Sequence, residues 1–240
     1  HSPLQATSKY LSRFDHIKNP KRKTYAAMVS AVDDGVGTVL DKLQQLNLTE
    51  NTIVIFLSDN GGPETDNGSD NGPLRAGKGS LFEGGIRVPF AMQWPSQIKA
   101  NTKYEQPVIS LDIFATIAAN IGKAAAPKNE LDGVNLLPFL KGAKQGSPHE
   151  YLFWRHFDQK NYAVLHQSGF KEVILRDSSF SLYNLKAEID EKTKVDDAKM
   201  MSTFEQQRKK WEANTVAPLF YGLNQEEQYE REKKAQQKKQ

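Results

Sequence analysis

One feature of the sequence constrains the fold most. Apolar residues at helical spacing are followed by a short, continuous apolar run. Residues 24–46 place apolar side chains three and four positions apart, which predicts an amphipathic helix with Thr24 as its N-cap. Gly35 and Gly37 weaken this helix, and we expect them to permit close backbone packing. Residues 53–57 (IVIFL) are typical of a strand that is buried on both faces. A helix that feeds such a strand is half of an α/β layer.

Two further segments in the N-terminal part continue this pattern. Residues 87–95 (RVPFAMQWP) predict another short strand, and residues 110–122 predict a second helix. Ser110 is its expected N-cap, and Gly122 is the expected stop after its last turn. We expect the apolar face of this helix to point inward through Leu111, Phe114, Ile117, Ala118 and Ile121.

The C-terminal part has a different texture, with four short strand-like runs separated by polar breaks. These runs are YLFWR, YAVLHQ, FKEVILR and FSLYNL, and they predict an antiparallel meander. A helix is expected next, with Asp196 or Asp197 as its cap and Met201, Phe204 and Trp211 at helical spacing. We therefore expect three regions. Residues 1–147 form an α/β domain, residues 148–222 form a small antiparallel α+β subdomain, and residues 223–240 form a charged tail that is a solvated helix or disordered.

Composition excludes several classes of protein. The net charge of +3 is too small to predict a nucleic-acid partner, because basic and acidic residues are interleaved. No apolar run approaches the ~20 residues that a membrane-spanning helix needs, so we expect no membrane span. The absence of cysteine excludes disulfides, a thiolate nucleophile and a cysteine-based zinc site in this chain.

The tripeptide Asp-Asn-Gly occurs three times, beginning at Asp59, Asp66 and Asp70. Asn and Gly tolerate the left-handed backbone conformation, so any copy can be a simple turn. Only the first copy directly follows a predicted strand, and ligands of open α/β sheets bind at the carboxyl ends of strands. Asp59 and Asn60 therefore offer two hard oxygen ligands for a metal, of the kind that Ca²⁺ or Mg²⁺ prefers. The second and third copies are interpreted as turns.

A lysine between two glycines is the next candidate. Lys78 is a compact positive charge on a backbone that can approach an anion closely. The segment is not a phosphate-binding P-loop, because Gly79 occupies the Ser/Thr position and no strand precedes it. Farther along, Trp154, Arg155 and His156 carry the aromatic and donor groups of a sugar site, with core packing of Trp154 equally open.

Several segments together resemble the formylglycine-dependent sulfatases of the alkaline phosphatase superfamily. They are HSPLQATSKYLSRF, YAAMVSAVDDGVGTVLDKL, NTIVIFLSDNGG, PLRAGKGSLFEGGIRVPF, LDGVNLLPFLKG and SLYNL, in the order and at the intervals of that family. The resemblance runs from residue 1 to about residue 185. It implies a partial sulfatase-like sandwich of helices on a mixed sheet, with a small C-terminal antiparallel sheet plus helix.

The resemblance also implies roles for four residues. Asp59 and Asn60 match two of the calcium ligands, with Ca²⁺ expected in preference to Mg²⁺. Lys78 matches the lysine that holds the sulfate and its bridging oxygen. His1 matches a histidine that contacts the sulfate and is a candidate proton donor to the leaving alcohol. These roles agree with the chemistry of the side chains, because a lysine adds a fixed positive charge and a histidine exchanges a proton near neutral pH.

Three parts of the family pattern do not occur in this sequence. They are the Cys/Ser-x-Pro-x-Arg motif that yields the formylglycine nucleophile, a paired aspartate ligand set and a Lys-x-His segment. The family places all three upstream of the segment that matches His1. We therefore expect the chain to be the C-terminal half of a sulfatase, inactive alone, with the N-terminal half of the same protein as its partner and the formylglycine on that half.

The function implied is hydrolysis of a sulfuric ester, with a sulfated carbohydrate as the expected substrate and a periplasmic or secreted location. Two alternatives stay open. One is a phosphodiesterase or phosphonate hydrolase of the same superfamily, since tetrahedral anions and the metal site are shared. The other is a non-catalytic, calcium-dependent module that binds acidic glycans.

Overall fold

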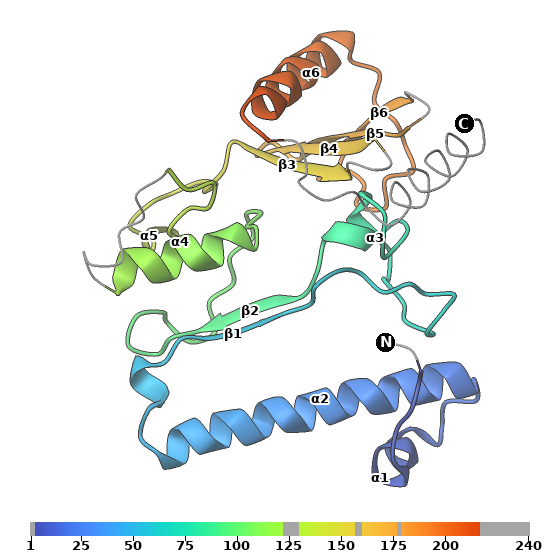
Figure 1. Cartoon of the computed structure of the whole chain (residues 1–240), viewed down its shortest axis with the longest axis vertical. Helices are drawn as coiled ribbons and strands as arrows, with labels where there is room; N and C mark the ends of the chain where they lie inside the picture. The colour runs from blue at the N-terminus through green and yellow to red at the C-terminus, as the bar shows by residue number, and fades with distance from the viewer. Residues whose placement is uncertain (1–2, 122–129, 157–159, 177–178, 217–240) are drawn as a thin grey trace, which may run out of the picture. The chain divides into compact units, whose positions relative to one another are not determined.

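The computed structural model describes residues 3–121, 130–156, 160–176 and 179–216. The chain divides into two compact units, His1–His149 and Glu150–Gln240, called here the N-terminal unit and the C-terminal unit. Figure 1 colours their elements along the chain. The predicted tail, residues 223–240, and the predicted stop at Gly122 lie outside the described residues.

A long helix, α2 (Pro20–Gln45), dominates the first part of the N-terminal unit (Figure 1). It begins four residues before the predicted start, since Asn19 is the N-cap and its side-chain oxygen accepts a hydrogen bond from the Arg22 amide at 3.0 Å. Pro20 occupies the first turn, where its missing N–H costs nothing. The prediction of Thr24 as the cap was wrong. Its hydroxyl instead donates to the carbonyl of Pro20 within the helix at 2.9 Å.

The short helix α1 (Ser8–Leu11) and the 3₁₀ turn η1 (Ser12–Phe14) lie against α2. Arg13 of η1 links this segment to α2, because its two terminal nitrogens donate to the two carboxylate oxygens of Asp34, both at 2.9 Å. This hydrogen bonding by Arg13 lowers the pKa of Asp34 to about 2. Such a forked pair fixes orientation as well as charge.

The apolar side of α2 is partly exposed. Ala27 is its buried residue, whereas three valines are 50–57% exposed: Val29, Val32 and Val39. The expectation that Gly35 and Gly37 permit close packing was wrong, because a Cβ atom added at either position meets no atom within 4 Å. The helical pattern was read correctly, but within the described part of the unit these three valines stay exposed.

A two-stranded antiparallel ribbon follows, formed by β1 (Val54–Leu57) and β2 (Phe90–Gln93), after the 3₁₀ turn η2 (Thr49–Asn51). Both strands were predicted. The expectation that the first is buried on both faces was wrong, because Phe56 is 45% and Leu57 38% exposed. Successive side chains point to opposite faces of a strand, so each face of the ribbon has an exposed side chain of β1 that the described residues do not cover.

The second predicted helix is α4 (Leu111–Asn120), and its buried face matches the predicted one only in part: Ala118 is buried as expected and Ile117 is half-buried. Hydrogen bonds of two polar side chains decide which side of α4 is buried. Asp112 accepts a hydrogen bond from the Val134 amide at 2.8 Å, and Thr116 accepts one from the Leu136 amide at 2.9 Å. Three side chains expected inside are therefore 52–65% exposed: Leu111, Phe114 and Ile121. Ser110 stands at the N-cap position but makes no capping hydrogen bond. The short helix α5 (Leu137–Leu140) follows.

The C-terminal unit contains the predicted meander. Its strands are β3 (Tyr151–His156), β4 (Asn161–His166), β5 (Phe170–Ile174) and β6 (Phe180–Asn184), all antiparallel in that order. Helix α6 (Ala198–Ala213) has Asp197 as its N-cap, and the side chain of Asp197 accepts a hydrogen bond from the Met200 backbone N–H at 2.9 Å. Phe204 of this helix packs with Val164 and Leu182 of the sheet in a closed apolar core.

Charged groups are also buried in this sheet. Lys171 and Glu191 form an ion pair at 2.9 Å with fully buried side chains. Glu172 is paired with Leu182 in register and flanked by Val164 on the other side, with no exposed surface. Neither of its carboxylate oxygens has a hydrogen-bond partner among the described residues. Burial raises the pKa of the Glu172 carboxyl to about 7.

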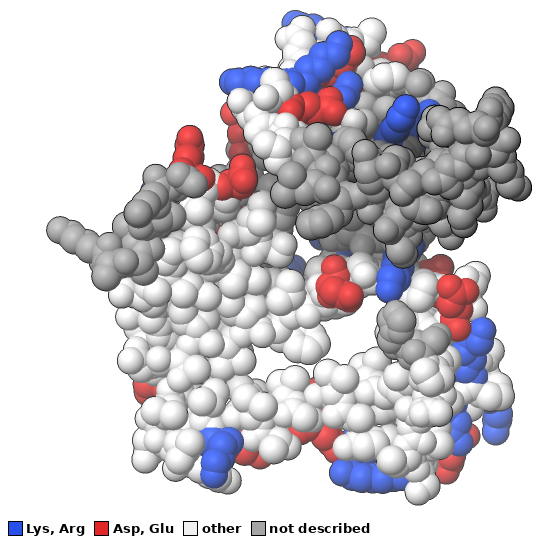
Figure 2. Space-filling model, viewed as in Figure 1, with Lys and Arg blue, Asp and Glu red and all other residues white. Residues whose placement is uncertain are grey.

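The described surface carries charges of both signs. Figure 2 shows Lys and Arg interspersed with Asp and Glu over the face that it presents. None of the helices in the described ranges combines the length and the apolar character that crossing a membrane requires.

Candidate functional site

The first Asp-Asn-Gly copy lies where β1 ends, in a segment called here the strand-end loop (residues 58–62). The Ser58 amide donates to the carbonyl of Pro89 at 3.2 Å, which continues the β1–β2 pairing by one bond. The Ser58 hydroxyl donates to the carbonyl of Asn60 at 2.8 Å, and the Asn60 amide donates to Oδ1 of Asp59 at 2.9 Å. These bonds fix the turn that presents both candidate metal ligands.

Each of these two side chains keeps an oxygen available. Nδ2 of Asn60 donates to the Gly61 carbonyl at 2.9 Å, and Oδ1 of Asn60 accepts no hydrogen bond from a described residue. Oδ2 of Asp59 likewise accepts none, because the Asn60 backbone N–H bonds to Oδ1 of Asp59. Two hard oxygens suit Ca²⁺, which takes about six to eight oxygen ligands. No group of three or more His, Asp or Glu in the described residues could hold a metal alone. The pair therefore fits a site that needs further ligands.

Glycines bring three backbone segments into direct contact around this loop. The Gly61 amide donates to the carbonyl of Gly85 at 3.0 Å. A Cβ at Gly61 would lie 1.6 Å from the carbonyl oxygen of Gly84, and one at Gly77 would lie 2.1 Å from that of Gly62. Any side chain at these positions would force the segments apart. Glycine here permits backbone to approach backbone.

Lys78 belongs to one of these segments, called here the lysine loop (residues 75–80). Its amide lies 3.4 Å from the carbonyl oxygen of Gly62 in the strand-end loop. Its side chain is exposed and forms no hydrogen bond or ion pair with another described residue. The charge is thus available to an anion. His1, the other predicted catalytic residue, lies outside the described residues.

The third segment is the short helix α3 (Glu83–Ile86). The Gly84 amide donates to the carbonyl of Arg75 at 2.8 Å, which ties α3 to the start of the lysine loop. Glu83 is only 4% exposed, and its carboxylate lies 3.5 Å from the guanidinium of Arg87. This buried acidic side chain and its basic partner suit a role in holding the loop.

The third Asp-Asn-Gly copy has a role that the sequence did not reveal. Oδ1 of Asn71 accepts a hydrogen bond from the Gly62 amide at 2.8 Å, and its Nδ2 donates to the carbonyls of Gly62 and Ala76, both at 2.9 Å. The expectation of a turn was incomplete, since this side chain joins the strand-end loop to the lysine loop. No sequence signal distinguishes it from a turn residue, because its hydrogen bonds reach two loops whose paths in space the sequence does not show.

The second copy is a turn, as expected. Oδ1 of Asn67 accepts a hydrogen bond from the Ser69 amide two residues later at 2.9 Å. Gly68 then adopts a positive φ of 74°, which glycine accommodates without strain.

The predicted sugar-binding residues lie on β3 in the C-terminal unit. Trp154 pairs with Ala163 and His156 with Asn161, so these two side chains share one face of the strand. Arg155 points to the other face, where its guanidinium donates to the Thr215 hydroxyl at 3.1 Å and the Val216 carbonyl at 3.2 Å. The structure does not bring the three side chains together on one face. Their role in substrate binding stays a prediction.

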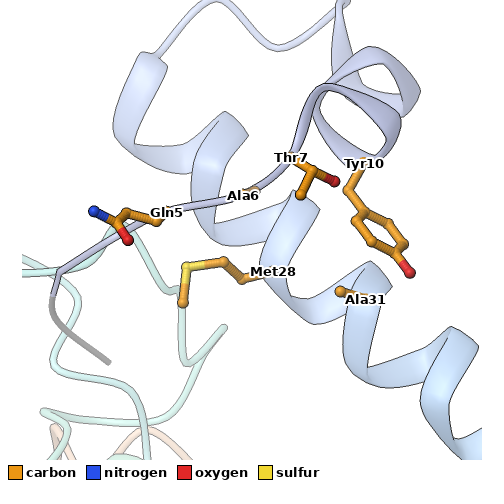
Figure 3. A pocket seen from close by; sticks show the side chains of 6 residues that line it. All are labelled: Gln5, Ala6, Thr7, Tyr10, Met28 and Ala31. Carbon is orange, nitrogen blue, oxygen red and sulfur yellow. The ribbon is translucent and has the colours of Figure 1, made fainter.

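An open hollow on the N-terminal unit contains none of these residues. It has a volume of about 490 Å³ and is lined by Gln5, Ala6, Thr7, Tyr10, Met28 and Ala31. Figure 3 shows these side chains on the N-terminal segment and the facing side of α2. Its lining has no ionisable group apart from the Tyr10 phenol, so it offers little to an anionic ester.

Known proteins of more than one activity are similar to this chain. Human steryl-sulfatase is 34% identical over 159 residues, which covers 63% of this chain and 27% of that protein. The crystal structure of Ps i-CgsB in complex with k-i-k-neocarrahexaose is 34% identical with a TM-score of 0.82, covering 94% of this chain and 51% of that one. The phosphonate monoester hydrolase of Agrobacterium radiobacter is 25% identical with a TM-score of 0.60, covering 80% and 40%.

The likeness to Ps i-CgsB confirms the predicted fold class, an α/β sulfatase-like fold with a small C-terminal antiparallel sheet plus helix. The chain spans only about a quarter of human steryl-sulfatase and about half of Ps i-CgsB. A family model described as Sulfatase matches residues 1–123, and one described as N-sulphoglucosamine sulphohydrolase, C-terminal, matches residues 77–217. The first match includes the strand-end loop, and both include Lys78. The chain therefore belongs to the sulfatase family.

Proposed function

We propose that this chain supplies part of the active site of a sulfuric ester hydrolase. Asp59 and Asn60 bind a calcium ion, and Lys78 binds the sulfate group. One observation carries the proposal: the strand-end loop and the lysine loop are joined through Gly62, which bonds to the Lys78 amide and lies two residues after Asn60. Candidate metal ligands and an available cation therefore belong to one rigid backbone network.

Each residue has a task that follows from its chemistry. A Ca²⁺ ion held by these two ligands would offset the negative charge of the sulfate group. Lys78 places a compact positive charge against the sulfate and its bridging oxygen, and a fixed charge of this kind stabilises the transition state without solvent rearrangement. His1 is proposed to protonate the leaving alcohol, because imidazole changes its charge near neutral pH.

The site is proposed to be completed by an N-terminal half of the same protein. That half would carry the formylglycine nucleophile and the remaining metal ligands. The greater length of the relatives supports this proposal, since the chain covers 51% of Ps i-CgsB. The uncovered apolar side chains of Val32 on α2 and Phe56 on β1 also support it, because such faces are buried in complete α/β domains.

The proposed substrate class is a sulfated carbohydrate. Ps i-CgsB, which is similar over 94% of this chain, was solved with a bound hexaose. Trp154, Arg155 and His156 are proposed to contribute to sugar binding, as an aromatic face and nearby donors commonly do. A periplasmic or secreted location is part of the same proposal and rests on the family resemblance alone.

The experiment is a hydrolysis assay on the complete enzyme, with matched sulfate, phosphate and phosphonate esters. We expect the sulfate ester to give the highest kcat/KM, removal of calcium by a chelator to abolish turnover, and the 240-residue chain alone to be inactive. Faster hydrolysis of the phosphonate ester would favour the second candidate, a phosphonate hydrolase, which the likeness to the Agrobacterium radiobacter enzyme supports. Calcium-dependent glycan binding without any turnover would contradict both and leave a binding module.

A further inference from the structure

Asn71 holds a position that the proposed reaction does not yet use. Its side chain makes three hydrogen bonds to backbone atoms of two different loops, at 2.8, 2.9 and 2.9 Å. Two of them engage both the amide and the carbonyl of Gly62, in the way that a neighbouring strand would. The third engages the carbonyl of Ala76, two residues before Lys78.

The amide group of Asn71 is tightly enclosed. A Cβ at Gly77 would lie 2.8 Å from its Nδ2, and a Cβ at Gly62 would lie 3.4 Å from its Oδ1. The backbone of Asn71 is fixed as well, because its amide donates to the Glu64 carboxylate at 3.0 Å and its carbonyl accepts from Leu74 at 3.3 Å. The side chain therefore has one available place.

Only a primary amide satisfies these contacts. The position requires one acceptor, facing the Gly62 amide, and two donors, facing the carbonyls of Gly62 and Ala76. Asp has nearly the same shape but presents only acceptors when ionised, so its carboxylate would face two carbonyl oxygens. Ala would leave all three backbone groups without this partner.

We propose that Asn71 is a positioning residue that sets the location of Lys78 relative to Asp59 and Asn60. The inference rests on the proposed function. Asn71 acts through backbone, since Gly62 lies two residues beyond Asn60 and Ala76 two residues before Lys78. Loss of the link would leave the metal ligands on their strand-end turn, which is held separately by Ser58. It would release the lysine loop and move the positive charge away from the sulfate.

The test compares Asn71→Asp with Asn67→Ala in the complete enzyme. Asn67 is a matched control because it is also an Asn of an Asp-Asn-Gly copy, is 8% exposed, and among the described residues its side chain bonds only within its own turn. Four quantities are measured: kcat and KM on a sulfate ester, the Kd for Ca²⁺, the melting temperature, and hydrogen exchange of the peptide covering residues 75–80.

We expect Asn71→Asp to lower kcat about 100-fold, the cost of a displacement of about 1 Å at a reacting centre. KM and the Kd for Ca²⁺ should change less than about threefold, and exchange in residues 75–80 should become faster. Asn67→Ala should lower the melting temperature because it removes the hydrogen bond to the Ser69 backbone N–H, and should leave kcat within about threefold. Asn71→Gln serves as a second variant, because it restores the donors on a longer arm and should recover protection of residues 75–80 in part.

The outcomes separate the two proposals. If the wild-type enzyme hydrolyses the sulfate ester and kcat of Asn71→Asp stays within about threefold of it, the positioning role is wrong while the proposed function holds. Equal losses of kcat in Asn71→Asp and Asn67→Ala would likewise reduce Asn71 to a stabilising residue. If the wild-type enzyme hydrolyses no sulfate ester, the proposed function fails and the positioning role fails with it.

Discussion

The two units of the chain differ in how much of their apolar side chains they bury. The C-terminal unit closes its own core, where Phe204 on α6 is 2% exposed against Val164 and Leu182 of the sheet. In the N-terminal unit, Val32 on α2 is 56% and Phe114 on α4 is 59% exposed. Both units have clear secondary structure, but the N-terminal unit leaves far more of its large hydrophobic side chains exposed. Element formation and core formation are separate steps, and the second requires a partner surface.

The largest expected effect concerns the uncovered faces. Val32→Asp should leave the secondary structure of the chain alone almost unchanged, because the side chain there is more than half exposed. With a co-expressed N-terminal half, the same variant should abolish co-purification, since an unpaired charge would be buried in the proposed interface. Lys42→Asp, on the polar part of α2, is the charge control. Undiminished co-purification of Val32→Asp would contradict the claim that the exposed side of α2 binds the N-terminal half.

The next effect tests the closed core of the C-terminal unit. Phe204→Ala should lower the free energy of unfolding of this unit by about 3–5 kcal/mol, because it removes a fully buried ring and leaves a cavity. Phe114→Ala, in the N-terminal unit, is the exposed counterpart and should change the free energy of unfolding of that unit by less than about 0.5 kcal/mol in the chain alone. Urea denaturation measures both. Equal effects of the two variants would show that the cores do not differ as described.

A smaller effect concerns the buried carboxyl under α6. Burial raises the pKa of Glu172 from 4.5 to about 7, so between these pH values the folded unit binds more protons than the unfolded chain. Stability of the C-terminal unit should therefore fall as pH rises from about 4.5 to about 7. Glu172→Gln should flatten this dependence, as followed by melting temperature against pH.

The charged groups around Glu172 come from α6. Arg208 favours the ionised form of Glu172 and Glu205 opposes it. Glu205→Gln, whose side chain is 41% exposed, is the control and should leave most of the pH dependence in place. A pH profile of Glu172→Gln that matches the wild type would contradict the assignment to this carboxyl.

The smallest effect tests the observed start of α2. Asn19→Ala should cost about 1 kcal/mol, because it removes the acceptor for the Arg22 amide. Thr24→Ala should cost less, since the Thr24 hydroxyl bonds to a carbonyl within the helix. Amide exchange of the first turn measures the difference. A larger cost at Thr24 would restore the start predicted from the sequence.

The sequence predicted best where local patterns and packing agree. The four strand-like runs between residues 151 and 185 and the cap expected at Asp196 or Asp197 led to the observed sheet and α6, because this unit buries its apolar side chains between the two. The buried face of α4 was predicted only in part, for the opposite reason. Asp112 and Thr116 bond to a loop that no periodicity describes, and these bonds decide which side of the helix faces inward.

The residues of the candidate site also differ in how far the sequence could predict them. Asp59 and Lys78 could be chosen from the sequence, because a carboxylate after a strand and a lysine between glycines carry their chemistry in their residue type and neighbours. Asn71 could not be chosen, since its contacts depend on the path of two loops in space. A turn residue and a residue that joins two loops have the same sequence signature.

The most direct test of the central claim is kcat of Lys78→Ala in the complete enzyme on a sulfate ester, with Lys99→Ala as an exposed lysine control. Our account predicts that Lys78→Ala loses about 100-fold or more in kcat, as removal of one preorganised charge from a transition state does. Lys99→Ala should keep normal kcat. A Lys78→Ala enzyme with near-normal kcat would contradict the account.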